Sequence, residues 1–149
     1  MASLAKESKA TQGKKLSKQE YIWLASGVCL KECVGERELG LPPLADPLKA
    51  TDADMPGAAK YGDGLIPILQ RRQVALKALG LPDLVYDLEV LKEALRQDAI
   101  KLACFIKAND AAHRGNSAEF RRQWLRGRQA DLVAVPLFKD FGLPLCAAD

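Results

Sequence analysis

The sequence predicts an all-α protein: an irregular bundle of three to four helices around one long central helix. Residues 83–112 contain no Gly or Pro, and leucines recur there in steps of three and four. That spacing lays an apolar stripe along one side of a helix, because about 3.6 residues complete a turn. Leu and Ala are also abundant, and both favour helix. The 149 residues fit one domain, which we place at 17–149 behind a polar, basic leader at 1–16.

The first helix begins at Ser17. Residues 17–20 read Ser-Lys-Gln-Glu, a capping box in which the Ser17 hydroxyl accepts from a first-turn N–H and the Glu20 carboxylate reaches back to the Ser17 N–H. Leu16 and Tyr21 occupy the positions of the flanking hydrophobic staple. We expect this helix to continue to Gly35 or slightly beyond.

A long Pro/Gly-rich loop follows, at about residues 36–64. Its prolines and glycines, among them Pro42 and Gly57, exclude a long helix, and no alternation supports a strand. A connection of this length is uncommon in a compact domain unless it binds or wraps something. Apolar residues such as Leu44 and Leu48 predict an ordered strap across the helices. Within the loop, residues 61–64 (Tyr-Gly-Asp-Gly) read as a turn, because they lack the order of a phosphate-binding loop.

A shorter helix is expected at about residues 65–79, with Pro67 tolerated in its first turn. Gly80 and Pro82 end it, and Asp83 then caps the long helix. The tight connection predicts an antiparallel hairpin of these two helices.

A further helix runs from Asn116 to about Val135, where Pro136 interrupts it. Within the long helix, Asp98 falls where the leucine stripe expects an apolar residue. It either points outward or meets an arginine, Arg72 or Arg122, as a buried pair that sets the register.

Composition and charge exclude several classes of protein. The net charge of +3 is too small to imply nucleic-acid binding by itself. The start has no apolar core of the length that a secretory signal needs, and the longest uncharged run, near residues 21–30, is too short to span a bilayer. The four cysteines show no spacing typical of a disulfide framework. We therefore expect a soluble protein of the cytoplasm or an organellar interior, a reducing compartment, and not a secreted one.

The best candidate site is the arginine-rich segment 120–128, together with leader lysines. Four arginines interleaved with aromatic rings could neutralise phosphates and stack on bases or lipid headgroups. The same residue types are enriched at protein interfaces, and a plain solvated helix face is the third interpretation. The candidate residues are Arg121, Arg122, Trp124, Arg126, Arg128, Lys14 and Lys15.

Other reactive side chains suggest little chemistry. Cys29 and Cys33 lie four apart on one helix face, where they could be metal ligands or a redox pair, but small buried core residues are the favoured interpretation. His113, the only histidine, suits the C-terminal end of a helix. We identify no catalytic residue, metal site or cofactor.

The predicted function is that of a non-catalytic interaction or scaffold protein, an accessory subunit of a larger assembly whose partners are other protein subunits. Three features motivate this prediction of a scaffold role: extended segments too long for a minimal bundle, one helix longer than its neighbours can cover, and no recognisable cluster of reactive side chains. The alternative is a nucleic-acid-binding module that uses the helix 120–128 and the leader lysines. An acidic lipid surface is a third possible partner.

Overall fold

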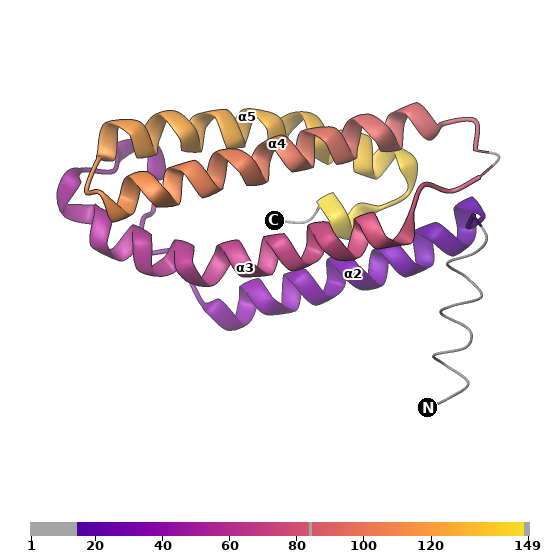
Figure 1. Ribbon diagram of the computed structural model, residues 1–149, viewed down its shortest axis with the longest axis horizontal. Helices are drawn as coiled ribbons and strands as arrows, with labels where there is room; N and C mark the ends of the chain where they lie inside the picture. Colours follow the sequence, from indigo (N-terminus) through magenta and orange to yellow (C-terminus); the bar gives the residue numbers. More distant parts are fainter. Residues whose placement is uncertain (1–14, 84, 148–149) are drawn as a thin grey trace.

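The computed structural model is a bundle of four helices arranged in two layers, with α2 and α3 in one layer and α4 and α5 in the other (Figure 1). It describes residues 15–83 and 85–147, and these contain no strand. The elements in chain order are α2 (Lys18–Leu39), η1 (Pro47–Lys49), η2 (Asp52–Asp54), α3 (Met55–Leu79), α4 (Leu88–His113), α5 (Ser117–Phe141) and η3 (Pro144–Ala147), where η is a 3₁₀ helix. The predicted all-α class is confirmed. No helix in these ranges is long and apolar enough to cross a membrane.

The predicted start of the first helix is confirmed. Glu20 N–H donates to Ser17 Oγ at 3.2 Å, and Ser17 N–H donates to Glu20 Oε1 at 3.0 Å, as a capping box requires. Leu16 and Tyr21 are both buried beside it. The helix ends at Gly40, whose φ of 90° lies in a region that favours glycine.

α2 continues to Leu39, slightly beyond Gly35 as expected, but the loop predicted at about 36–64 is wrong at its C-terminal end, because α3 begins at Met55. Pro56 falls in the first turn of α3, where a missing N–H costs little. Gly62 and Gly64, read as turn residues, lie inside α3 as packing positions. A Cβ on Gly62 would overlap the Asn109 side chain, and a Cβ on Gly64 would overlap Leu39.

The connection that remains, residues 40–54, is the strap. Leu44 packs on a cluster of buried residues, and the Asp52 carboxylate accepts bonds from Ser117 N–H at 3.0 Å and from Ser117 Oγ at 2.5 Å. Arg121 Nη1 donates to the Ala50 carbonyl at 2.6 Å. The strap is therefore attached to α5 by polar contacts.

The long helix begins at Leu88 with Asp87 as its N-cap, so the predicted cap at Asp83 is wrong. Asp83 N–H donates instead to the Leu16 carbonyl at 2.8 Å, a long-range bond that holds it outside the helix. Leu84 lies outside the described residues. The four helices have 22, 25, 26 and 25 residues, so α4 is not longer than its neighbours can cover, and one motive for a scaffold role is removed.

The helix that starts at Ser117 does not stop at Pro136. It continues to Phe141, because Phe138 and Phe141 are buried on the same side as Ala134 and anchor its last turns. Pro136 itself is exposed, and the hydrogen bond that it cannot donate is outweighed by this packing. Asn116 caps the helix as predicted, accepting from Glu119 N–H at 3.1 Å.

Two core clusters lie at opposite ends of the bundle, and a small third cluster lies on α3 and α4. One end is built largely from large side chains, and η3 packs there against both α2 and α5. We call it the disulfide end; its buried residues are Leu16, Tyr21, Ala25, Cys29, Leu76, Leu91, Ala94, Ala134, Phe138, Phe141, Leu143, Cys146 and Ala147. The other, the strap end, is built largely from alanines: Ala50, Met55, Ala58, Ala59, Ala108, Ala111, Ala112 and Phe120. The third comprises Leu65, Leu69 and Leu102.

Candidate functional site

The arginine-rich segment lies on α5, and several of its side chains have partners within the molecule. Arg121 reaches the strap, Arg122 pairs with Glu119, and Arg128 Nη1 lies 3.7 Å from Asp131. Arg122 and Arg126 are exposed on the helix surface. The predicted segment is thus in part a structural contact between α5 and the strap.

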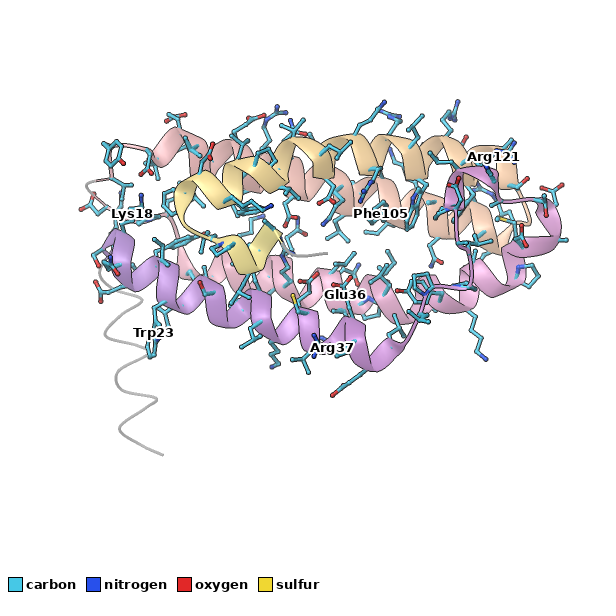
Figure 2. The ribbon with its side chains drawn as sticks, turned by 180° about the vertical axis from the view of Figure 1, so that it is seen from behind. Lys18, Trp23, Glu36, Arg37, Phe105 and Arg121 are labelled. Carbon is cyan, nitrogen blue, oxygen red and sulfur yellow. A yellow bond between two sulfur atoms is a disulfide. The ribbon has the colours of Figure 1, made fainter. Side chains whose placement is uncertain are left out.

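The leader lysines do not join this segment. Lys15 is exposed just before α2, and Lys14 lies outside the described residues. Figure 2 places Lys18 and Arg121 at opposite ends of the bundle. A single surface that combines Lys15 with Arg121 is therefore not formed by one molecule.

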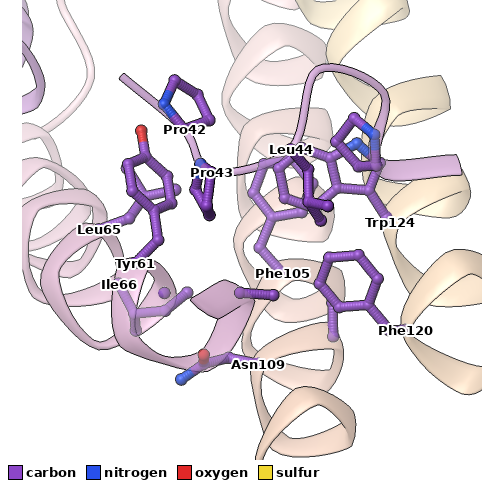
Figure 3. A pocket seen from close by; sticks show the side chains of 14 residues that line it. Pro42, Pro43, Leu44, Tyr61, Leu65, Ile66, Phe105, Asn109, Phe120 and Trp124 are labelled. Atoms are coloured by element: carbon purple, nitrogen blue, oxygen red, sulfur yellow. The ribbon is translucent and has the colours of Figure 1, made fainter. Parts of the chain in front are cut away.

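Trp124 is stacked inside the molecule. Its ring centroid lies 4.5 Å from that of Phe105 and 5.8 Å from that of Phe120, with nearly parallel planes. The three rings line a small apolar pocket beneath Pro42, Pro43 and Leu44 of the strap (Figure 3). The pocket volume is about 40 Å³, room for a few water molecules. Trp124 therefore supports the strap, and its ring is not free to stack on a base.

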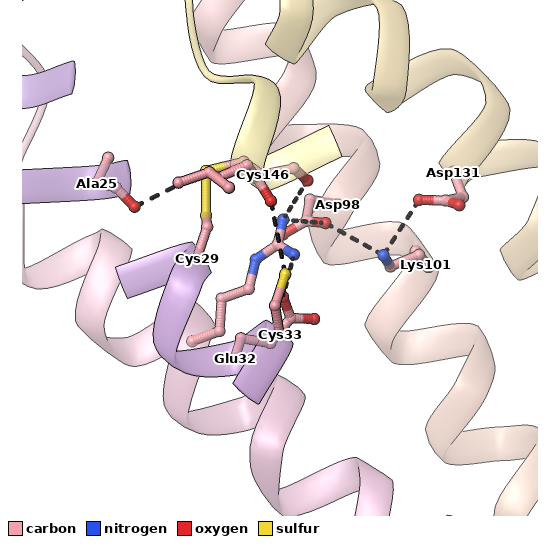
Figure 4. A network of polar contacts seen from close by, with 10 residues as sticks. Ala25, Cys29, Glu32, Cys33, Asp98, Lys101, Asp131 and Cys146 are labelled. Atoms are coloured by element: carbon pink, nitrogen blue, oxygen red, sulfur yellow. Dashed lines mark hydrogen bonds and ion pairs between the residues drawn. A yellow bond between two sulfur atoms is a disulfide. The ribbon is translucent and has the colours of Figure 1, made fainter. Parts of the chain in front are cut away.

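Cys29 and Cys146 form a disulfide, with their Cα atoms 5.0 Å apart (Figure 4). The bond links α2 to η3 across 117 residues, and both cysteines are buried. The sequence interpretation, which expected no disulfide, is wrong because a pairing over this distance leaves no local spacing to read. Disulfides persist mainly in oxidising environments, so this bond does not fit the predicted reducing compartment well.

A buried cluster of charged side chains lies beside the disulfide (Figure 4). Arg72, 4% exposed, donates to Glu32 at 3.2 Å, to Asp98 at 3.1 Å and to the Cys146 carbonyl at 3.3 Å. One cation thus joins α2, α3, α4 and η3, and of the alternatives that the sequence left open for Asp98, the structure has the pairing with Arg72. Lys101 extends the cluster, with Nζ 3.6 Å from Asp98 and 3.1 Å from Asp131 of α5.

Glu36 is the carboxyl of this region whose ionisation is most altered. Burial, followed by the charge and the hydrogen bond of Glu32, raises its pKa to about 7. A carboxyl that titrates near neutral pH could exchange protons with a bound molecule. Within the described residues, however, no group of three or more His, Cys, Asp or Glu side chains could hold a metal ion. The cluster joins the layers and does not by itself define a reaction.

His113 is the last residue of α4, the helix-end position that the sequence predicts. Its Nε2 lies 2.7 Å from Asp63 Oδ1, which also accepts from Asn109 Nδ2 at 3.0 Å. These bonds, that of His113 first, lower the pKa of Asp63. The histidine therefore ties α4 to α3 at the strap end.

The most exposed apolar surface on a helix is the outer face of α2. Trp23 is 79% exposed, Leu30 51% and Val34 46%, and Gly27 completes their spacing of four, three and four residues. This stripe lies opposite the buried residues of α2, and Figure 2 shows Trp23 pointing away from the bundle. Val34 and Gly27 also line an open groove of about 810 Å³ between α2 and α3.

The sequence analysis placed a helix at this position and did not identify the exposed face. The sequence did contain a sign of this exposed face, because apolar residues occur on two opposite sides of the helix that became α2. A helix that is apolar on both sides needs a cover on both. Within residues 15–83 and 85–147, α3 and η3 cover only one of these sides.

Comparison with models of protein families, with curated proteins and with solved structures gave no match to this chain. The exposed face of α2, the buried charged cluster and the disulfide are the features from which a function can be inferred.

Proposed function

We propose that this chain is a non-catalytic accessory subunit that binds another protein through the outer face of α2. The observation that supports this is the exposed stripe of Trp23, Leu30 and Val34. Contiguous apolar surface of this kind is typical of protein interfaces, and Trp is among the residues that contribute most to binding energy. The rigid α2 presents these side chains in fixed positions.

Trp23 is expected to supply the largest single share of the binding energy of this face. Burying a Trp side chain of about 200 Å² contributes about 5 kcal/mol before the cost of association is subtracted. Leu30 and Val34 add to this on the same face. A loss of Trp23 should therefore remove most of the affinity.

The groove beside the stripe indicates the kind of partner. Its lining includes apolar side chains such as Val28 and Ile68, with Lys31 on the α2 side and Arg71 on the α3 side. An amphipathic helix of the partner fits such a groove when acidic residues flank its apolar face. Glu38, at one end of the groove, sets the direction in which such a helix would lie, because it repels acidic residues there.

Affinity capture with three forms of the full chain tests the proposal. Wild type and Leu132→Ala should recover the same partner, and Trp23→Ala should lose it. Leu132 is a matched control, because it is 61% exposed but lies on α5 in the other layer. Circular dichroism should be the same for all three forms. A stable monomer that recovers nothing, or equal recovery by Trp23→Ala, would contradict the proposal.

Nucleic-acid binding stays the second candidate. The exposed Arg122 and Arg126 lie on one side of α5 and could contact phosphates. Binding of a single-stranded RNA oligonucleotide that weakens steeply with salt, and weakens further in Arg122→Ala and Arg126→Ala, would favour this candidate over protein binding.

A further inference from the structure

A free thiol lies one helical turn from the disulfide. Cys33 follows Cys29 by four residues on α2 and is only partly buried, whereas Cys29 is fully buried. Figure 4 shows its sulfur on the side of α2 that faces η3. Cys29 and Cys33 therefore present two sulfurs to the same C-terminal segment from consecutive turns, about 6 Å apart along the helix axis.

The contact between Cys33 and η3 shows how close the third sulfur is. Cys33 Sγ lies 3.9 Å from the carbonyl oxygen of Leu145, the residue just before Cys146. The planar peptide unit places the Cys146 Cα about 3 Å from that oxygen, so Cys33 Sγ lies within about 7 Å of this Cα. Cys33 therefore lies beside the short segment that carries Cys146.

We propose that Cys33 is a second disulfide partner for Cys146, and that the bond transfers between Cys29 and Cys33 by intramolecular exchange. The Cys33 thiolate attacks Cys146 Sγ, and a Cys33–Cys146 bond forms as the Cys29–Cys146 bond breaks. Cys29 leaves as a thiolate and takes up a proton. One disulfide and one thiol are present before and after, so no external oxidant or reductant is needed.

The exchange changes both reactivity and structure. The free thiol moves from the partly exposed Cys33 to the buried Cys29, where a water-soluble reagent cannot easily reach it. Arg72, which donates to the Cys146 carbonyl, must follow η3 or lose this bond. The position of the disulfide is thereby coupled to the charged cluster between the layers.

The charges around Cys33 slow the reaction at neutral pH. Burial and the carboxylates of Glu32 and Glu36 raise the pKa of the thiol, against the opposing effect of Arg72 from α3 and Arg37 from α2. Because the thiolate is the attacking species, exchange should become faster as the pH rises. Glu36→Gln removes one of these negative charges above about pH 7, where Glu36 is ionised, and should give faster exchange at pH 8.5.

Tryptic mapping distinguishes the two bonds, because Lys31 lies between Cys29 and Cys33. The oxidised chain is held at pH 8.5, its free thiols are blocked with N-ethylmaleimide in denaturant, and it is digested. Cys29, Cys33, Cys104 and Cys146 then fall on separate peptides: 19–31, 32–37, 102–107 and 140–149. We expect a link between 32–37 and 140–149 beside the link between 19–31 and 140–149.

Two variants complete the test. Cys29→Ser, oxidised with glutathione disulfide, should give the link between 32–37 and 140–149, and Cys33→Ser should give only the link to 19–31. A link between 32–37 and 140–149 in wild type supports the proposal, whereas its formation in Cys29→Ser alone overturns the transfer of the bond. Absence of this link from both forms overturns the proposal. Links to the Cys104 peptide at similar yield would indicate random pairing in an unfolded chain and would also overturn it.

Discussion

The two ends of the bundle are closed in different ways. At the disulfide end, η3 enters between α2 and α5 and packs against large side chains such as Tyr21, Phe138 and Phe141. At the strap end, alanines such as Ala108 and Ala111 let the helices approach closely, and the strap covers them through hydrogen bonds to α5. One end is closed by a covalent bond and large side chains, the other by small side chains and polar contacts.

Because the two ends are closed differently, we expect the free energy of unfolding to be unevenly distributed along the four helices, although these have similar lengths. Large buried side chains and a long-range disulfide contribute much more than alanine contacts and partly buried hydrogen bonds. The disulfide end should therefore remain folded when the strap end opens locally. Changes at each end of the bundle, beginning with the most destabilising, can test whether the two ends differ in stability.

Removing the cation of the buried cluster should have the largest effect. Arg72→Met keeps the length of the side chain but leaves Glu32 and Asp98 without their partner, and breaking a buried ion pair costs about 3–5 kcal/mol. Urea unfolding measures the loss. Arg71→Met, on the exposed adjacent position of α3, is the control and should change the free energy of unfolding little. A loss below about 1 kcal/mol for Arg72→Met would show that the cluster does not hold the layers together.

Opening the disulfide should have the next largest effect, confined at first to one end. Cys29→Ser combined with Cys146→Ser removes a link across 117 residues, and native disulfides contribute about 2–4 kcal/mol. Hydrogen exchange should show faster exchange of amides in α2, with little change at the start of α5. Cys33→Ser is the control. Equal acceleration at both ends would mean that the ends are not independent.

Two glycine-to-alanine substitutions, one at a packed position and one at an open position, should change stability by smaller amounts and in opposite directions. In Gly127→Ala the new Cβ would lie 2.5 Å from the Phe105 ring, which is stacked on Trp124 and cannot move freely. Overpacking should outweigh the helix propensity of Ala and cost about 1–2 kcal/mol. Gly27→Ala meets nothing within 4 Å and should stabilise α2 by up to about 1 kcal/mol. Thermal unfolding checks both, and a stabilising Gly127→Ala would show that the strap end is loosely packed.

The last expected effect is a dependence of stability on pH that comes from Glu36, and it is reduced because this carboxyl is only partly buried and solvent screens its interactions. Its pKa in the folded protein is raised to about 7 from 4.5, so the folded state holds a proton that the unfolded state loses between these values. The stabilising contribution is complete below about pH 4.5 and is lost as the pH rises through 7. Urea unfolding of wild type and Glu36→Gln at pH 5 and pH 7.5 isolates this group from the others. The variant should lose less stability between the two pH values, and an identical loss would contradict the assignment.

Signals within one or two turns could be read from the sequence. The capping box at Ser17, the cap at Asn116 and the helix end at His113 depend on neighbouring residues and are confirmed. The pairing of Asp98 with Arg72 was one of two alternatives, because a charge on an apolar stripe needs either water or a partner. Only the packing of α3 on α4 decided between them.

The candidate site was less predictable than the fold. An arginine-rich helix has the same sequence whether its side chains face solvent or a strap, and Arg121 faces the strap. Trp124, a candidate binding residue, is stacked on Phe105, whereas Trp23, for which the sequence suggested no role, is exposed. Helical periodicity places a residue on a face but does not say whether another element covers that face.

The sequence by itself determined that the chain is helical, where two of its helices begin and which residues share a helix face, because these depend on interactions between near neighbours. The tertiary structure decided the rest. Met55–Leu79 continues through its glycines because they fit against Asn109 and Leu39, and Ser117–Phe141 continues through Pro136 because Phe138 and Phe141 are buried. Cys29 meets Cys146 because η3 packs between two helices, a contact between residues far apart in the chain that no local pattern encodes.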